Sequence, residues 1–264
     1  MTIITQDALP VSHCVFTALH HNIHPHTHYF PVSQFSDEVI QLLPERESDF
    51  RHLEGLLQQH QSIDIQDVPL PSSPEETRES MLCRMLTFTF TAAIRSEKLL
   101  ESIIREFNEF NLHAVYVLVR SHLELAALAR FANKNIREHV TKKDVDRLDR
   151  FLEKLVLGNL FMSKEHEYPV KPFHIGSVVR ELEKISPQIP RMYYFLSEFT
   201  HPNMGALVLT SQPDTEKGVN VFDRRRPPRD TDFMQTVNIA IATAELILKD
   251  VSELLLLDVS ALED

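Results

Sequence analysis

Residues 112–128, LHAVYVLVRSHLELAAL, decide the fold, because this segment is apolar around nearly its whole circumference when it is drawn as a helix. Asn111 stands immediately before it, where an asparagine can cap the first turn. A helix that is apolar on every side is stable only when other helices surround it. The segment therefore predicts the central helix of an all-α bundle, and we expect it to end near Asn133.

Further helices are expected on both sides of this segment. Ser36 can cap a helix over residues 37–60, which we expect to be divided near Pro44. The sequence Ser73-Pro74-Glu75-Glu76 offers an N-cap, a proline at the first helical position and a glutamate at the third, so it predicts a helix that continues to about Asn108. The remaining expected helices cover residues 136–162, 176–185, 193–201 and 231–257.

A small β-hairpin is expected before the last helix. Residues 205–210 and 219–222 are apolar runs, and the segment between them contains Pro213, Asp214 and Gly218, which are typical of turns. The fold class that follows is all-α: a helical bundle with one small β-hairpin before the C-terminal helix.

The proline-containing segment 62–74 is expected to be a linker between two parts of the chain. Residues 1–72 would then form an irregular, histidine-rich N-terminal arm with one helix, and residues 73–264 the bundle domain. A chain of 264 residues is long enough for one sizeable domain with such an appendage.

Composition and charge exclude several classes of protein. The net charge of −11 means that the surface as a whole does not attract nucleic acid or anionic membrane, so any polyanion site has to be local. The five glycines form neither a dinucleotide-binding nor a P-loop motif. Two distant cysteines, Cys14 and Cys83, suggest no disulfide framework. With no signal peptide evident and no long uncharged apolar run, we expect a cytoplasmic protein that is not bound to a membrane.

Tyr116, Arg120 and Glu124 are spaced four residues apart and therefore lie on one face of the expected central helix. A guanidinium that is buried alone is very costly, so Arg120 needs a partner, and Glu124 can supply it. Two interpretations stay open. The group is either an ion pair within the helix that holds a neighbouring helix, or part of a functional polar pocket.

Ser197 and His201 form a second candidate group, on one face of a helix that stops at Pro202. A serine hydrolase is disfavoured, because the chain has no GxSxG turn and because helical serines commonly bond the carbonyl one turn back. We favour His201 as a proton-transfer group that acts with an arginine, which would hold a phosphate. Such a pair can cleave RNA without a metal, with the neighbouring 2′-hydroxyl as the nucleophile.

The blocks RSHLE (residues 120–124) and LSEFTHPN (residues 196–203) resemble those of uncharacterised bacterial helical proteins related to the HEPN superfamily. The resemblance covers residues 80–250. HEPN domains are helical bundles that usually dimerise; many are metal-independent endoribonucleases of toxin–antitoxin, abortive-infection and phage-defence systems, and others bind nucleotides, RNA or proteins. Active members carry an arginine and a histidine with four to six residues between them, late in one helix. Here Arg191 and His201 have nine residues between them, so Arg120 and His201 would have to meet from different helices.

The resemblance implies a homodimeric, RNA-directed protein without a cofactor, with an antitoxin or another defence-system protein as a partner. In a catalytic version His201 is the general acid and base, Arg120 binds the phosphate and Glu124 orients Arg120. The supporting polar groups would be Tyr116, Tyr194, Ser197 and Asn203. The alternative is a non-catalytic protein- or nucleotide-binding module, in which Arg120, Glu124, Ser197 and His201 form a buried network that fixes the register of the helices.

The N-terminal segment is rich in histidine. Its six histidines are His13, His20, His21, His24, His26 and His28. In an extended chain the last three would share one side and could face a transition metal. No carboxylate or cysteine completes a known ligand pattern, so we name no metal ligand, and a metal-dependent protein that uses these histidines is a third, less favoured interpretation.

Residues 223–230 contain the most concentrated basic sequence. The arginines of this segment are Arg224, Arg225, Arg226 and Arg229, and they stand between Asp223 and Asp230. They could hold RNA phosphates or the acidic surface of a partner. The interpretation we favour is a solvated loop in which the two aspartates are local counterions.

Overall fold

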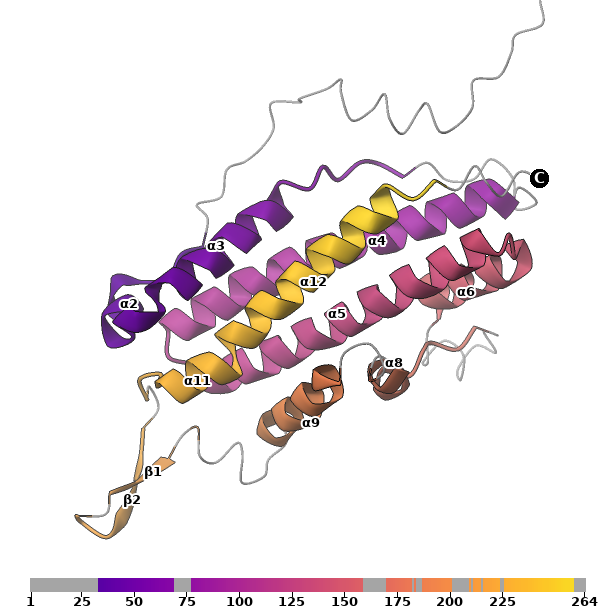
Figure 1. Ribbon diagram of the computed structural model, residues 1–264. Helices are drawn as coiled ribbons and strands as arrows, with labels where there is room; N and C mark the ends of the chain where they lie inside the picture. Colours follow the sequence, from indigo (N-terminus) through magenta and orange to yellow (C-terminus); the bar gives the residue numbers. More distant parts are fainter. Residues whose placement is uncertain are drawn as a thin grey trace, which may run out of the picture.

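The computed structural model describes residues 33–68, 77–158, 170–181, 187–200, 211–214, 216–223 and 226–258, together with the single residues 183 and 209. Over these residues the protein is an all-α bundle with one two-stranded antiparallel sheet, as the sequence predicts (Figure 1). The N-terminal histidines and the proposed cap around Ser73 lie outside the described residues.

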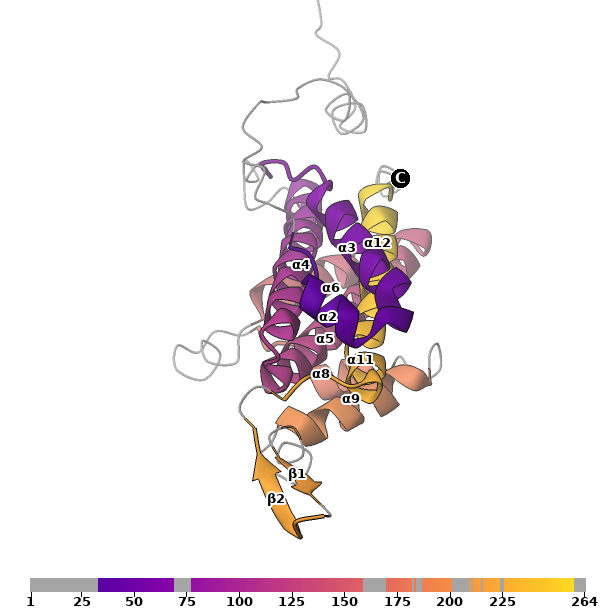
Figure 2. The same cartoon turned by 90° about the vertical axis from the view of Figure 1, so that its left-hand side faces the viewer.

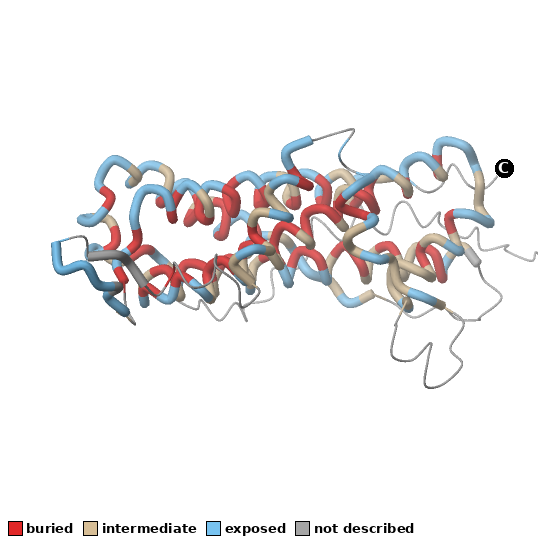
Figure 3. Tube along the Cα trace, turned by 90° about the horizontal axis from the view of Figure 1, so that it is seen from below, coloured by how far each residue is buried: buried red, intermediate tan, exposed pale blue. Residues whose placement is uncertain are grey.

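The central helix of the bundle is α5 (Leu112–Thr141). It packs against α4 (Thr77–Asn108) and α12 (Val237–Leu255), and also against three shorter helices. These are α6 (Val145–Leu157), α8 (Ile175–Glu181) and α9 (Gln188–Thr200). Figure 1 shows α8 and α9 on the side of α5 that faces away from α3 (Glu47–Gln61). Buried residues form a band along the interior of the long helices (Figure 3). The prediction that residues 112–128 form the central helix is therefore confirmed.

The C-terminal end of α5 was predicted wrongly. The helix runs past Asn133 to Thr141, because the Asn133 side chain donates hydrogen bonds to Asp250 and Glu253 on α12, each at 2.7 Å, and does not compete with the backbone of its own helix. The break falls instead at residues 142–144, where Asp144 caps α6 by accepting a hydrogen bond from the N–H of Arg147.

The N-terminal helices belong to the same core as the rest of the bundle. Ser36 caps α2 (Asp37–Leu42), and the predicted division near Pro44 is a 3₁₀ turn, η1 (Pro44–Arg46), before α3. The ring of Phe50 lies 4.4 Å from that of Phe35 and 5.1 Å from that of Phe233, measured between centroids. The hydrophobic core is therefore continuous across the predicted domain boundary between residues 72 and 73.

Two other predicted helices have different bounds in the structure. The helix predicted over residues 231–257 consists of α11 (Asp230–Gln235) and α12, which are separated at Thr236. Helix α9 begins at Gln188, five residues before the predicted start, with Pro190 in its first turn, where a missing N–H costs little.

The hairpin is present and projects from one end of the bundle (Figure 2). Its strands are β1 (Ser211–Asp214) and β2 (Val219–Phe222), and Ser211 lies opposite Phe222. The first strand therefore lies later than residues 205–210, and Pro213, which we expected in the turn, belongs to it. Gly218, with φ of 65°, lies in the connection.

Among the described helices, α5 alone is long and apolar enough to cross a membrane by length and composition. In the bundle, 56% of its most apolar window is buried against other helices. The central helix of a bundle has these same properties.

Candidate functional site between α5 and α9

Arg120 connects the central helix to α9. Its Nη1 donates to the hydroxyl of Thr200 at 2.6 Å, and its Nη2 donates to the hydroxyl of Tyr193 at 3.2 Å. The guanidinium carbon also lies 5.1 Å from the centroid of the Tyr193 ring, which is a cation–π distance. The arginine is thus held at the C-terminal end of α9.

Glu124 holds the same guanidinium from the other direction, as the four-residue spacing predicts. The distance from its Oε1 to Nε of Arg120 is 3.3 Å, and the two side chains are 27% and 22% exposed. Burial raises the pKa of Glu124, while the charges of Arg120 and Arg95 lower it in part. Nε of Arg120 is buried and makes no well-aligned hydrogen bond within the described residues. The carboxylate therefore contributes mainly through its charge.

The terminal nitrogens of Arg120 keep part of their hydrogen-bonding capacity. Each carries two hydrogens, and each makes one hydrogen bond to a described residue. Tyr193 and Thr200 fix this guanidinium, which is one-fifth exposed and has a second N–H on each terminal nitrogen. These are the properties of a group that binds an oxyanion.

Ser197 is engaged within its own helix. Its hydroxyl donates to the carbonyl of Tyr193 at 2.7 Å, which is the structural interpretation that the sequence offered. The hydroxyl that contacts Arg120 belongs to Thr200, and the contacting tyrosine is Tyr193, whereas Tyr194 is 55% exposed. The spacing of residues 193, 197 and 200 on one helical face was the signal that would have found these two partners.

His201 and Asn203 lie outside the described residues, so a meeting of Arg120 with His201 stays a prediction. The structure brings Arg120 to Thr200, the residue that precedes His201 in the chain.

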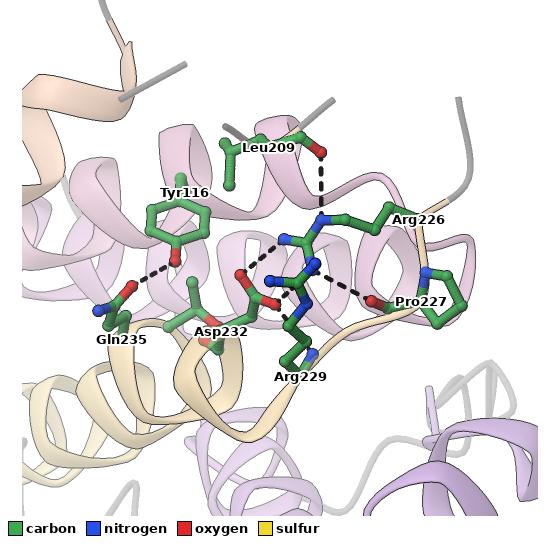
Figure 4. A network of polar contacts seen from close by, with 8 residues as sticks. Tyr116, Leu209, Arg226, Pro227, Arg229, Asp232 and Gln235 are labelled. Carbon is green, nitrogen blue, oxygen red and sulfur yellow. Dashed lines mark hydrogen bonds and ion pairs between the residues drawn. The ribbon is translucent and has the colours of Figure 1, made fainter. Parts of the chain in front are cut away.

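Tyr116 and Arg226 belong to a separate buried network, which ties α11 to α5 (Figure 4). The Tyr116 hydroxyl donates to Gln235 at 2.7 Å, and burial raises its pKa. The guanidinium of Arg226 is paired with both carboxylate oxygens of Asp232 at 2.9 Å, and its Nε donates to the carbonyl of Leu209. Figure 4 shows the arginine and the aspartate facing each other beside Tyr116.

This network corrects two predictions about the basic segment. Arg226 is 5% exposed and paired, so it neither stands in a solvated loop nor offers its guanidinium to a phosphate. Its counterion is Asp232, because Asp230 pairs with Arg46 at 2.7 Å. Arg224 and Arg225 lie outside the described residues.

A second buried network was missed at the sequence level. Ser96 on α4 lies 2.8 Å from Nε2 of His122 on α5 and 3.3 Å from Nε2 of His60 on α3, and Nδ1 of His122 lies 2.7 Å from the hydroxyl of Thr243 on α12. Four long helices thus meet at one polar chain inside the core. The signal was His122, a histidine in the helix that the sequence predicts to be central and buried.

The hydrogen positions in this chain follow from Thr243. Its hydroxyl donates to the carbonyl of Ile239 at 2.8 Å, so it accepts from Nδ1–H of His122. Nε2 of His122 is then an acceptor for the hydroxyl of Ser96, which in turn accepts from Nε2–H of His60. Both rings are neutral in this arrangement, and burial lowers the pKa of His122 to about 3 and that of His60 to about 4.

Across the described ranges, no group of three or more histidine, cysteine, aspartate or glutamate side chains is arranged to hold a metal ion. The six N-terminal histidines fall outside these ranges.

Comparisons of the chain with protein-family models, with curated proteins and with solved structures find no match. The geometry around Arg120 and the resemblance of residues 120–124 and 196–203 are therefore what supports a functional proposal.

Proposed function

We propose that the protein is a HEPN-like, RNA-directed helical protein that cleaves RNA without a metal, with Arg120 as the phosphate-binding group and His201 as the proton-transfer group. The observation that supports this proposal is the 2.6 Å hydrogen bond from Arg120 to Thr200. This hydrogen bond fixes the partly exposed guanidinium of Arg120 beside Thr200, and Thr200 directly precedes His201 in the chain.

The proposed reaction needs one proton acceptor and one cation. His201 takes the proton of a ribose 2′-hydroxyl, and the oxygen attacks the adjacent phosphorus while the bond from phosphorus to the 5′-oxygen breaks. The protonated His201 then gives this proton to the leaving 5′-oxygen, and the products are a 2′,3′-cyclic phosphate and a 5′-hydroxyl. Arg120 stabilises the charge that develops on the phosphoryl oxygens, and Glu124 with Tyr193 keeps it in place.

The test is incubation of the purified protein with total RNA in EDTA. We expect cleavage by the wild type, and a loss of about 100-fold or more in rate for His201→Ala and for Arg120→Ala, which is the usual scale of general acid–base and electrostatic contributions. Arg105→Ala is the matched control, because the side chain of Arg105 is 67% exposed on α4. A wild type that cleaves no RNA, or that cleaves no faster than both active-site variants, excludes the nuclease.

One observation favours a second candidate, the non-catalytic module. Both terminal nitrogens of Arg120 donate to side chains of α9, as expected if the role of Arg120 is to hold α5 and α9 together. In that case Arg120→Ala and His201→Ala lower the melting temperature by several degrees, and the wild type binds its partner without cleaving RNA. The RNA assay and thermal unfolding of the same variants separate the two candidates.

The homodimer, the antitoxin or defence-system partner and the cytoplasmic location are further parts of the proposal, and the resemblance supports them. Light scattering on the purified chain tests the dimer.

A further inference from the structure

Arg95 on α4 lies beside the site on the exposed face of α5. The adjacent residue, Ser96, contacts His122 at 2.8 Å, which fixes α4 against α5 two residues before Glu124. The charge of Arg95 also acts on the Glu124 carboxylate. Arg95 and Arg120 thus approach the same carboxylate from two helices.

The helical period shows which side of α4 carries Arg95. Arg84 lies eleven residues earlier, which is three turns, so the two arginines share one face of the helix. Arg84 pairs with Asp149 on α6, and this face therefore points towards the side of α5 where α6 packs.

Arg95 is exposed and makes no hydrogen bond or ion pair with any residue in the described part of the chain. Arg84, on the same face, is paired, and so is Arg120. An unpaired guanidinium keeps its planar set of N–H donors for a ligand, and this arrangement fits phosphate oxygens better than an ammonium group does.

We propose that Arg95 is the second phosphate-binding residue of this site, so that Arg95 and Arg120 hold neighbouring phosphates of one single-stranded RNA. The inference rests on the proposed function and extends the site from α9 across α5 to α4. The strand is single because the attacking 2′-hydroxyl has to align with the bond that breaks, which the stacked geometry of a duplex prevents. The carboxylate of Glu124 is paired with Arg120 and is influenced by the charge of Arg95, and its own negative charge repels phosphate.

The test is the salt dependence of RNA binding, measured by fluorescence anisotropy with a labelled, unstructured oligoribonucleotide that carries 2′-O-methyl groups to block cleavage. Each phosphate contact with a single strand contributes a slope of about −0.7 to the plot of log K against log salt concentration. Loss of one contact by Arg95→Ala should therefore reduce the slope by about 0.7. If the electrostatic contribution of one phosphate contact vanishes near 1 M salt, Arg95→Ala should weaken binding about 8-fold at about 50 mM salt and about 3-fold at about 200 mM.

Two matched variants accompany Arg95→Ala. Arg95→Lys keeps the charge and should retain most of the slope, while Arg105→Ala removes an exposed arginine from the same helix and should leave the slope unchanged. Because Arg95 is exposed, its variants should keep the melting temperature of the wild type.

The outcomes separate this inference from the proposed function. If the wild type binds and Arg120→Ala weakens binding, but Arg95→Ala has the slope of the wild type, the role of Arg95 is wrong and the proposed function stands. An equal loss of slope in Arg105→Ala also overturns the role of Arg95, because the effect would then be one of general charge. A wild type that binds no RNA overturns both.

Discussion

Acidification should destabilise this protein through the two buried histidines. His122 and His60 are fully or almost fully buried and neutral in the folded state, where their pKa values are about 3 and about 4. In the unfolded chain a histidine titrates near 6.5. As the pH falls below 6.5, the unfolded state takes up two protons that the folded state does not bind. Stability is therefore fully present above pH 6.5 and is lost progressively as the pH falls towards the folded pKa values.

The size of the loss follows from the interval between the pH and the unfolded pKa. At about pH 5 each histidine is about 1.5 pH units below its unfolded pKa and still above its folded one, and each unit corresponds to about 1.36 kcal/mol. Each ring then costs about 2 kcal/mol, so the free energy of unfolding should fall by about 4 kcal/mol between about pH 7.5 and pH 5.

Urea unfolding followed by circular dichroism at several pH values measures this loss. His122→Gln should remove about half of the pH dependence, although it also lowers stability at neutral pH because it disturbs the chain from Ser96 to Thr243. His113→Gln, at an exposed position on the same helix, is the control and should keep the full dependence. A free energy of unfolding that stays constant from about pH 7.5 to 5, or a His122→Gln variant with the pH profile of the wild type, would refute this reasoning.

Three further predictions concern single side chains. Arg226→Met leaves Asp232 buried without its cation, so it should lower the free energy of unfolding by about 3–5 kcal/mol, while Arg226→Met with Asp232→Leu should recover most of that loss in thermal unfolding. Thr200→Val removes the acceptor for Nη1 of Arg120 and should cost about 1.5–3 kcal/mol in the same assay, together with RNA cleavage if the site is catalytic. Gly158→Ala should cost about 1–3 kcal/mol, measured by urea unfolding, because the new Cβ would meet two backbone atoms at 2.5 and 2.7 Å.

The sequence predicted those parts of the fold that depend on local patterns. Residues 112–128 predicted the central helix because a helix that is apolar on every side needs apolar surroundings on every side, and in this bundle the neighbouring helices supply them. The end of that helix was not predictable, because Asn133 is satisfied by Asp250, which lies 117 positions later in the chain. A residue that stops a helix in isolation does not stop it when another element binds its side chain.

The candidate site also has parts that follow from local sequence patterns and parts that depend on contacts between distant elements. The pair of Arg120 and Glu124 follows from a four-residue spacing on one helix, and the structure confirms it. That Arg120 contacts α9 was only a hypothesis, since contacts between helices depend on packing that a single sequence does not display. Arg226 shows the opposite error. A run of arginines was interpreted as solvated, but the turn into α11 carries one of them inward to Asp232.

Pairing of arginines with carboxylates decides where a polyanion can bind to a chain with a net charge of −11. An arginine that is already paired adds no net positive charge to its surroundings. The paired arginines on the described helices and loops include Arg46, Arg51, Arg84, Arg130, Arg137 and Arg226. Arg120 is also paired, with Glu124, whereas Arg95 acts on that carboxylate only through its charge and forms no ion pair with a described residue. The proposed phosphate site therefore lies where, among the described residues, Arg95 adds positive charge beside the pair of Arg120 and Glu124.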